Sequence, residues 1–170
     1  MNSKGVWILA AAALVVMGCA RDKPVPYRDE KLGFAAVFPG PPLNYRFSEQ
    51  TPFGAIEWFS RAYHPAIQLD QNFQVDVGNL PPGTQGGSTP EEAVETYYAW
   101  LLKRFGKVDR ARLPVGKGMG IRYQAMSPSG SHLEGILIIR RGRLHRAEAS
   151  VTKAKDPKAQ AFLESFEVLP

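Results

Sequence analysis

Short apolar runs, separated by glycine, proline and other turn residues, fill the chain from residue 34 onward. Runs of this kind are typical of strands. Within residues 71–77, Phe73, Val75 and Val77 alternate with polar side chains, a pattern that buries one face of a strand and leaves the other in water. Strands with one face buried and the other exposed to water are typical of an antiparallel sheet. The pattern predicts strands at 34–38, 43–49, 55–63, 71–77, 119–126, 132–140 and 143–151.

A helix start is encoded directly after a loop rich in glycine, proline and serine. Thr89 is a suitable cap, Pro90 suits the first helical position, and Glu92 stands three residues after the cap, as a capping box requires. Apolar side chains follow at helical spacing as far as Gly106. This spacing predicts a helix over 90–105, with the glycine as its stop.

A second, shorter helix is predicted after Asp156 and Pro157, which repeat the cap-plus-proline signal. Residues 166–169 then favour a closing edge strand. Strands outnumber helices and follow one another locally along the chain. The predicted fold class is therefore α+β, an antiparallel sheet flanked by helices.

The connection between the last two long strands is two residues long, Arg141 and Gly142. Glycine in the second position of such a connection favours a tight hairpin. With this turn, His132 stands opposite Val151, and His145 stands opposite Ile138. The two histidines are therefore expected to lie apart.

The N-terminal segment has the features of an export signal. Lys4 precedes an uncharged run over residues 5–17. As a helix this run reaches about 20 Å, whereas the hydrocarbon core of a bilayer is about 30 Å thick. A basic start followed by a short apolar stretch and small residues is typical of a secretory signal, here residues 1–18.

The end of that segment, Val16-Met17-Gly18-Cys19, resembles the bacterial lipoprotein box. The resemblance implies that Cys19 becomes the first residue of the mature protein and carries a thioether diacylglyceryl group and an amide-linked acyl chain. Several acyl chains anchor a protein stably to a membrane. Ala20 stands where an aspartate would retain the protein in the inner membrane, so outer-membrane sorting with the domain facing the periplasm is expected. The alternative is an ordinary thiol within an uncleaved anchor.

The remainder of the chain is expected to form a short tether and one domain. Residues 19–33 hold the lipidated cysteine, many charges and two prolines, which favours an extended leash. Residues 34–170 are expected to be a single α+β domain. The full chain has 170 residues, 44% of them hydrophobic, and a single cysteine, which excludes collagen-like, disordered and disulfide-stapled proteins.

Several short motifs of the predicted domain resemble the Mog1/PsbP-like superfamily. The first strand ends in Phe38-Pro39-Gly40-Pro41-Pro42, a capped helix follows the fourth strand, and the chain closes with Ala161-Phe162-Leu163-Glu164-Ser165-Phe166. The resemblance covers about residues 34–169 and implies an α/β/α sandwich. Characterised members bind proteins, one a small GTPase in nuclear transport and another the lumenal side of photosystem II. The resemblance therefore implies binding rather than catalysis.

Residues with catalytic or metal-binding chemistry form no recognisable motif. None of His64, His132 and His145 has a second ligand at the helical or hairpin spacing that a metal site needs. The glycine-rich segment 116–120 resembles a phosphate loop, but a strand rather than a helix follows it. We predict no catalytic residue, no metal and no cofactor.

Charge is distributed unevenly. Residues 103–158 hold 14 Lys or Arg against 4 Asp or Glu, whereas the whole chain has a net charge of +5. Four arginines crowd the predicted hairpin: Arg140, Arg141, Arg143 and Arg146. Such a patch can bind an anionic lipid head group, an anionic glycan or an acidic protein face. Nucleic acid is a general partner of basic patches, but an exported lipoprotein rarely meets it. The alternative is a solvated hairpin tip.

We therefore expect a lipid-anchored envelope protein, a non-enzymatic binding or accessory module that uses this basic surface. The alternative is a periplasmic small-molecule carrier or enzyme. Its pocket would lie between the loop at 78–88 and the aromatic face of the first helix, which carries Tyr97, Tyr98 and Trp100. Aromatic side chains on a helix are more often core, and of these three Trp100 is expected to be the most exposed.

Overall fold

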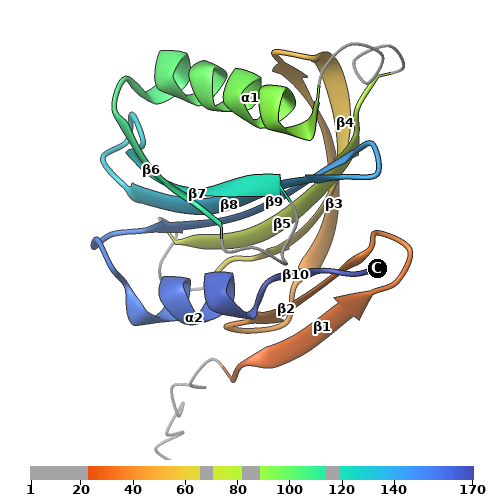
Figure 1. Ribbon diagram of the computed structural model, residues 1–170. Coiled ribbons are helices and arrows are strands. Elements are labelled where there is room, and N and C mark those ends of the chain that lie inside the picture. The colour runs from red at the N-terminus through yellow and green to blue at the C-terminus, as the bar shows by residue number, and fades with distance from the viewer. Residues whose placement is uncertain (1–22, 66–70, 82–88, 114–118) are drawn as a thin grey trace, which may run out of the picture.

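A computed structural model describes residues 23–65, 71–81, 89–113 and 119–170. Within these ranges the chain forms two antiparallel sheets and two helices (Figure 1). The lipoprotein box and Cys19 lie outside the described residues. The elements, in chain order, are β1 (Val25–Asp29), β2 (Phe34–Phe38), β3 (Leu43–Thr51), β4 (Gly54–Tyr63), β5 (Asn72–Asn79), α1 (Pro90–Phe105), β6 (Val108–Arg112), β7 (Met119–Met126), β8 (His132–Arg140), β9 (Arg143–Val151), α2 (Pro157–Ser165) and β10 (Glu167–Val168).

The larger sheet has the strand order β3-β4-β5-β9-β8-β7-β6. The β8–β9 hairpin has the expected register, with His132 opposite Val151 and His145 opposite Ile138. Its turn residues, Arg141 and Gly142, have φ angles of 50° and 74°. Two positive φ angles are the signature of the type I′ turn, which matches the twist of the strands on either side.

The two helices lie on opposite faces of this sheet (Figure 1). One apolar core lies between the sheet and α1 and includes Trp58, Tyr97 and Leu101. The other lies on the opposite face, where α2 and the smaller sheet β1-β2-β10 pack together. The expected antiparallel sheet flanked by helices is confirmed, but the architecture is dominated by sheet and each face carries a single helix among the described residues.

The helix ends follow the sequence signals. The Glu92 backbone N–H donates to Thr89 Oγ1 at 3.2 Å, and the Thr89 N–H donates to Glu92 Oε2 at 2.8 Å, which completes the capping box. Gly106 has φ 77° and its N–H donates to the Leu102 carbonyl. At α2, the backbone N–H of Lys158 donates to Asp156 Oδ1.

The predicted tether is wrong for residues 25–33. β1 pairs with β2 along its whole length, and Tyr27 packs with its ring centroid 6.0 Å from Phe34 and 5.9 Å from Phe38. Pro26 fits because β1 is an edge strand, where a missing N–H donor costs nothing on the open side. The folded domain therefore begins with β1 rather than at residue 34.

Strand β6 also had no counterpart in the prediction. Among the described residues it pairs with β7 alone, at the edge of the larger sheet, and its sequence VDRAR lacks an apolar alternation. No helix among the described residues is long and apolar enough to cross a membrane.

Candidate binding cleft

The four arginines of the predicted basic patch do not share one surface. Arg140 and Arg143 stand opposite each other at the end of the β8–β9 hairpin. Arg140 Nη1 donates to the Val168 carbonyl at 3.1 Å, and Arg143 Nη1 donates to the Lys31 carbonyl at 3.2 Å. Both side chains thus reach toward the smaller sheet. Arg141, in the turn, is exposed.

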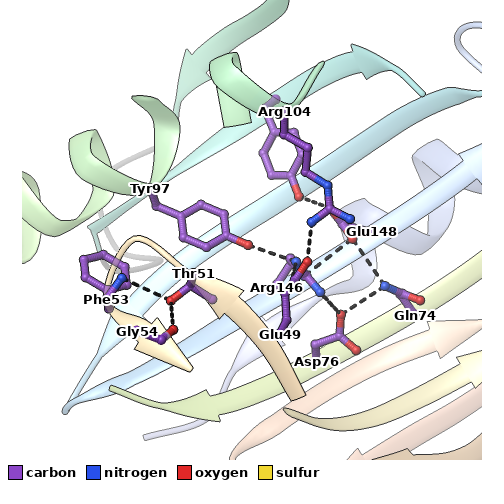
Figure 2. A network of polar contacts seen from close by, with 11 residues as sticks. Glu49, Thr51, Phe53, Gly54, Gln74, Asp76, Tyr97, Arg104, Arg146 and Glu148 are labelled. Carbon is purple, nitrogen blue, oxygen red and sulfur yellow. Dashed lines mark hydrogen bonds and ion pairs between the residues drawn. The ribbon is translucent and has the colours of Figure 1, made fainter. Parts of the chain in front are cut away.

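Arg146 is buried beneath α1, so its assignment to the basic surface is wrong. Only 4% of the residue is exposed. Its guanidinium lies 2.9 Å from Asp76 Oδ2, 3.0 Å from Glu49 Oε2 and 3.5 Å from Glu148 Oε2, and it donates to the Tyr97 hydroxyl at 2.9 Å (Figure 2). The alternation of β9 explains this outcome, because residue 146 points to the opposite side of the sheet from residue 143.

The surroundings of Arg146 keep its positive charge in place. Burial by itself would lower the pKa of Arg146, but the neighbouring Glu148 and other groups raise it well above its ordinary value. Burial raises the pKa of Asp76, and the guanidinium opposes that shift. Burial also raises the pKa of Tyr97 and Tyr123, so both phenols stay protonated. A guanidinium with this many partners is part of the core and is not available to an external anion.

A hollow of about 370 Å³ opens beside this network, at the C-terminal half of α1. Arg104 reaches over the Trp100 ring, 5.1 Å from its centroid, and contacts Glu49. Tyr97 is fully buried, while Tyr98 and Trp100 are half-buried, so the aromatic face is mainly core, as expected. The pocket predicted at 78–88 lies largely outside the described residues, because 82–88 are not among them.

A second opening, about 520 Å³, lies on the other side of the sheet and is basic. None of the residues that line it is acidic, and four of them are cationic. The lining is made by the β1–β2 turn, β3, β4, the end of β5 and the start of β9: Lys31, Leu32, Asn44, Tyr45, Arg46, Phe59, Arg61, Val77, Asn79 and Arg143. We call this opening the basic cleft.

Each arginine of the basic cleft is held in place by a neighbour. Arg61 donates to Asp29 Oδ2 and to the Tyr27 hydroxyl, both at 2.7 Å, and so ties β4 to β1. Arg46, on β3, lies with its guanidinium carbon 4.5 Å from the centroid of the Phe59 ring. The chain folds so that Asn44 and Arg61 are opposite each other in the β3–β4 pair.

The basic cleft suits a carboxylate or a phosphate. Guanidinium groups present several donors in a planar fork that matches the oxygens of both anions. The guanidinium of Arg61 is engaged by Asp29 and Tyr27, so the charge that an anion can meet comes from Lys31, Arg46 and Arg143. Asp29 is engaged with Arg61, and Glu57 lies 3.9 Å from Arg46 in an exposed pair, a type of contact that contributes little.

Sequence reasoning found only Arg143 among the cations of the basic cleft. Lys31 falls in the predicted tether, and Arg46 and Arg61 are single charges within predicted strands. The sequence holds no signal that joins them, since the β1–β2 turn, β3 and β4 meet only in the folded domain.

The remaining candidate residues lie apart. His132 and His145 are held at separate positions by the β8–β9 register, and the described residues contain no cluster of three or more His, Cys, Asp or Glu that could hold a metal ion. In the glycine-rich segment, residues 114–118 lie outside the described residues. Gly120 is in β7, where a Cβ atom would lie 2.1 Å from the Leu137 carbonyl oxygen, so this glycine serves strand packing.

No protein-family model matches the chain, and no curated protein does. Among solved structures, the chain is similar to the solution structure of cyanobacterial PsbP (CyanoP) from Synechocystis sp. PCC 6803, with a TM-score of 0.50 and 13% sequence identity. The similarity covers 89% of this chain and 95% of that one. The chain has a PsbP-like fold. At this identity the likeness extends to the fold alone, and function rests on the residues themselves.

Proposed function

We propose that this protein is a lipid-anchored envelope binding module that recognises an anionic partner through the basic cleft. The observation that carries the proposal is the set of four cationic side chains, Lys31, Arg46, Arg61 and Arg143, around one opening with no acidic residue in its lining. The proposed binding surface is therefore the basic cleft and not the tip of the β8–β9 hairpin, where the sequence predicts it. Binding requires no catalytic group.

The anchor would hold the cleft close to a membrane. Six residue steps separate Cys19 from Val25, the first residue of β1. Even fully extended, they span about 20 Å. A lipidated Cys19 would therefore present the domain within a few nanometres of the bilayer, where an envelope protein, an anionic lipid head group or an anionic glycan is within reach. Outer-membrane sorting toward the periplasm belongs to the same proposal.

A second candidate function is supported by the hollow beside α1. Its lining combines the rings of Phe47, Trp100 and Phe105 with Arg104, whose charge is offset by Glu49, a composition that suits a small, mainly apolar, neutral molecule. This is the alternative hypothesis of a small-molecule carrier or enzyme, with the pocket at the C-terminal half of α1. Ionic strength separates the two functions, because binding at an open basic cleft weakens strongly with salt whereas binding in a mainly apolar hollow responds little.

Cross-linking in intact cells, followed by mass spectrometry, tests the main proposal. The wild type is compared with the double variant Arg46→Glu and Arg143→Glu, which reverses two charges of the cleft. The control variant, Arg110→Glu with Lys153→Glu, makes the same change of net charge at exposed positions outside the cleft lining.

A partner recovered with the wild type and the control, but lost with the cleft variant, supports the proposed function. If both double variants lose the partner equally, total charge and not the basic cleft drives association. If all three proteins recover only bulk envelope proteins, the cleft proposal is wrong. Circular dichroism of the purified variants establishes that each is folded before the comparison is made.

A further inference from the structure

One edge of the larger sheet is open and carries two different faces. β3 is the terminal strand in the order, so among the described residues its outer edge has no strand partner. Six consecutive residues of the strand, 43–48, are exposed. An edge strand with unpaired N–H and C=O groups is a template for the addition of another strand.

The face of β3 toward α1 is apolar. Leu43, Tyr45 and Phe47 follow at alternate positions, with 62%, 42% and 37% of their surfaces exposed. They are the large exposed apolar side chains of this strand. Phe47 lies 6.5 Å from the buried Trp58 and Tyr45 lies 6.1 Å from the exposed His64, measured between ring centroids. The outer surface of this row is therefore accessible to apolar side chains from another segment.

The opposite face of β3 is polar and borders the basic cleft. Asn44 and Arg46 line the cleft from β3, and Arg61 stands behind Asn44 on β4. A strand added beside β3 would place alternate side chains about 5 Å from Asn44 and Arg46. The remaining side chains would fall beside Leu43, Tyr45 and Phe47, because side chains alternate between the faces of a strand.

We propose that the partner is an extended segment of another protein, with acidic and apolar residues in alternation, that pairs with β3. Its acidic side chains face Arg46 and the basic cleft, and its apolar side chains cover the Leu43, Tyr45 and Phe47 row. Backbone hydrogen bonds supply affinity in this mode and the alternate side chains supply specificity. The inference rests on the proposed function and names its partner class.

The test uses a fluorescent eight-residue peptide of alternating aspartate and valine, and measures its affinity for the folded domain by anisotropy. One comparison peptide has the same composition in two blocks, four aspartates followed by four valines. A second keeps the alternating sequence but is N-methylated at every residue, which removes the backbone donors and leaves the charges unchanged.

The protein variants separate the two faces of the strand. Arg46→Glu reverses the charge at the cleft, and Leu43→Ser removes an apolar side chain from the row without touching the cleft lining. Arg110→Glu is the matched control, because Arg110 lies on β6, the edge strand at the far side of the same sheet. Thermal unfolding of each variant shows whether the sheet is intact.

We expect the alternating peptide to bind at least about tenfold more tightly than the block and N-methylated peptides. A tenfold difference in affinity corresponds to about 1.4 kcal/mol of binding free energy. Arg46→Glu and Leu43→Ser should each weaken it, and Arg110→Glu should not. Equal affinity for all three peptides, with the dependence on Arg46 kept, would show charge recognition without strand pairing. The inference would then be wrong while the proposed function stands.

Failure of the inference is also distinguishable from failure of the proposed function when no peptide binds. If vesicles containing phosphatidylglycerol bind in a manner that depends on Arg46, the anionic partner is a membrane and strand addition is wrong. If neither vesicles nor peptides bind, and cross-linking in cells is indifferent to the cleft charges, both proposals are wrong.

Discussion

The Arg146 guanidinium and the Asp76 carboxylate lie 2.9 Å apart, directly opposite each other on β9 and β5, with neither accessible to water beyond a few per cent. Two strands at the centre of the larger sheet are thus joined by an ion pair in the core. Glu49 joins the same guanidinium from β3, so the interaction spans three strands. Because a buried charge needs its partners, removal of either member of the ion pair should lower the free energy of unfolding.

Arg146→Met should lower the free energy of unfolding by about 3–5 kcal/mol, since it leaves the carboxylates of Asp76 and Glu148 buried without their cation. Urea denaturation followed by circular dichroism measures the change. Arg141→Met is the control, because Arg141 is exposed in the turn, and it should shift stability by less than about 0.5 kcal/mol. A loss of less than about 1 kcal/mol for Arg146→Met would contradict the buried network.

Asp29→Ala should lower the free energy of unfolding by about 1–3 kcal/mol, because hydrogen bonds to charged groups are among the stronger ones. Asp29 accepts from Arg61 at 2.7 Å and from the Leu32 N–H at 2.9 Å. Hydrogen exchange should show faster opening of β1 in this variant. Glu30→Ala is the neighbouring control, since Glu30 is exposed. Unchanged protection of β1 would mean that the segment is held by apolar packing alone.

Burial and the nearby Arg143 and Arg140 lower the pKa of His145 from its ordinary 6.5 to about 4. Below pH 6.5 the unfolded chain takes up a proton that the folded chain refuses, so stability falls as the pH drops. The contribution is fully present above pH 6.5 and is lost progressively down to about pH 4. Over that window it amounts to at most about 3 kcal/mol.

The His145 effect is measured as a difference between two proteins. Acids also titrate between pH 4 and 6.5, so the unfolding free energy of the wild type is compared with that of His145→Gln at each pH. Glutamine has no proton to gain, so the variant should show a flatter profile across this window. Parallel profiles would mean that His145 does not contribute to the acid sensitivity.

Local signals predicted most of the elements. The Thr89 cap and Gly106 bounded α1 correctly because these signals act within a few residues, and the turn at Arg141 and Gly142 set the whole β8–β9 register. β1 was missed for the opposite reason. Its charges and prolines look like a linker, and it becomes a strand through contacts with other segments: backbone pairing with β2, the rings of Phe34 and Phe38, and Arg61 on β4.

The candidate site was less accessible from the sequence. A run of arginines shows charge, but only the alternation of β9 decides which side of the sheet each one occupies. Arg146 therefore lies in the core while Arg143 borders the basic cleft. The other cations of the cleft stand more than 80 residues before Arg143, and no local pattern brings Arg46 and Arg61 together.

Cys19→Ser should abolish the incorporation of labelled palmitate and release the protein from the membrane fraction, since a serine hydroxyl cannot form the thioether of a lipidated cysteine. Metabolic labelling and fractionation of cell envelopes measure both effects. Ala20→Asp is the informative companion, because it should keep the label but move the protein toward the inner membrane. Labelled, membrane-bound Cys19→Ser protein would show that the anchor is not at this residue, and the estimate of about 20 Å between bilayer and β1 would fall with it.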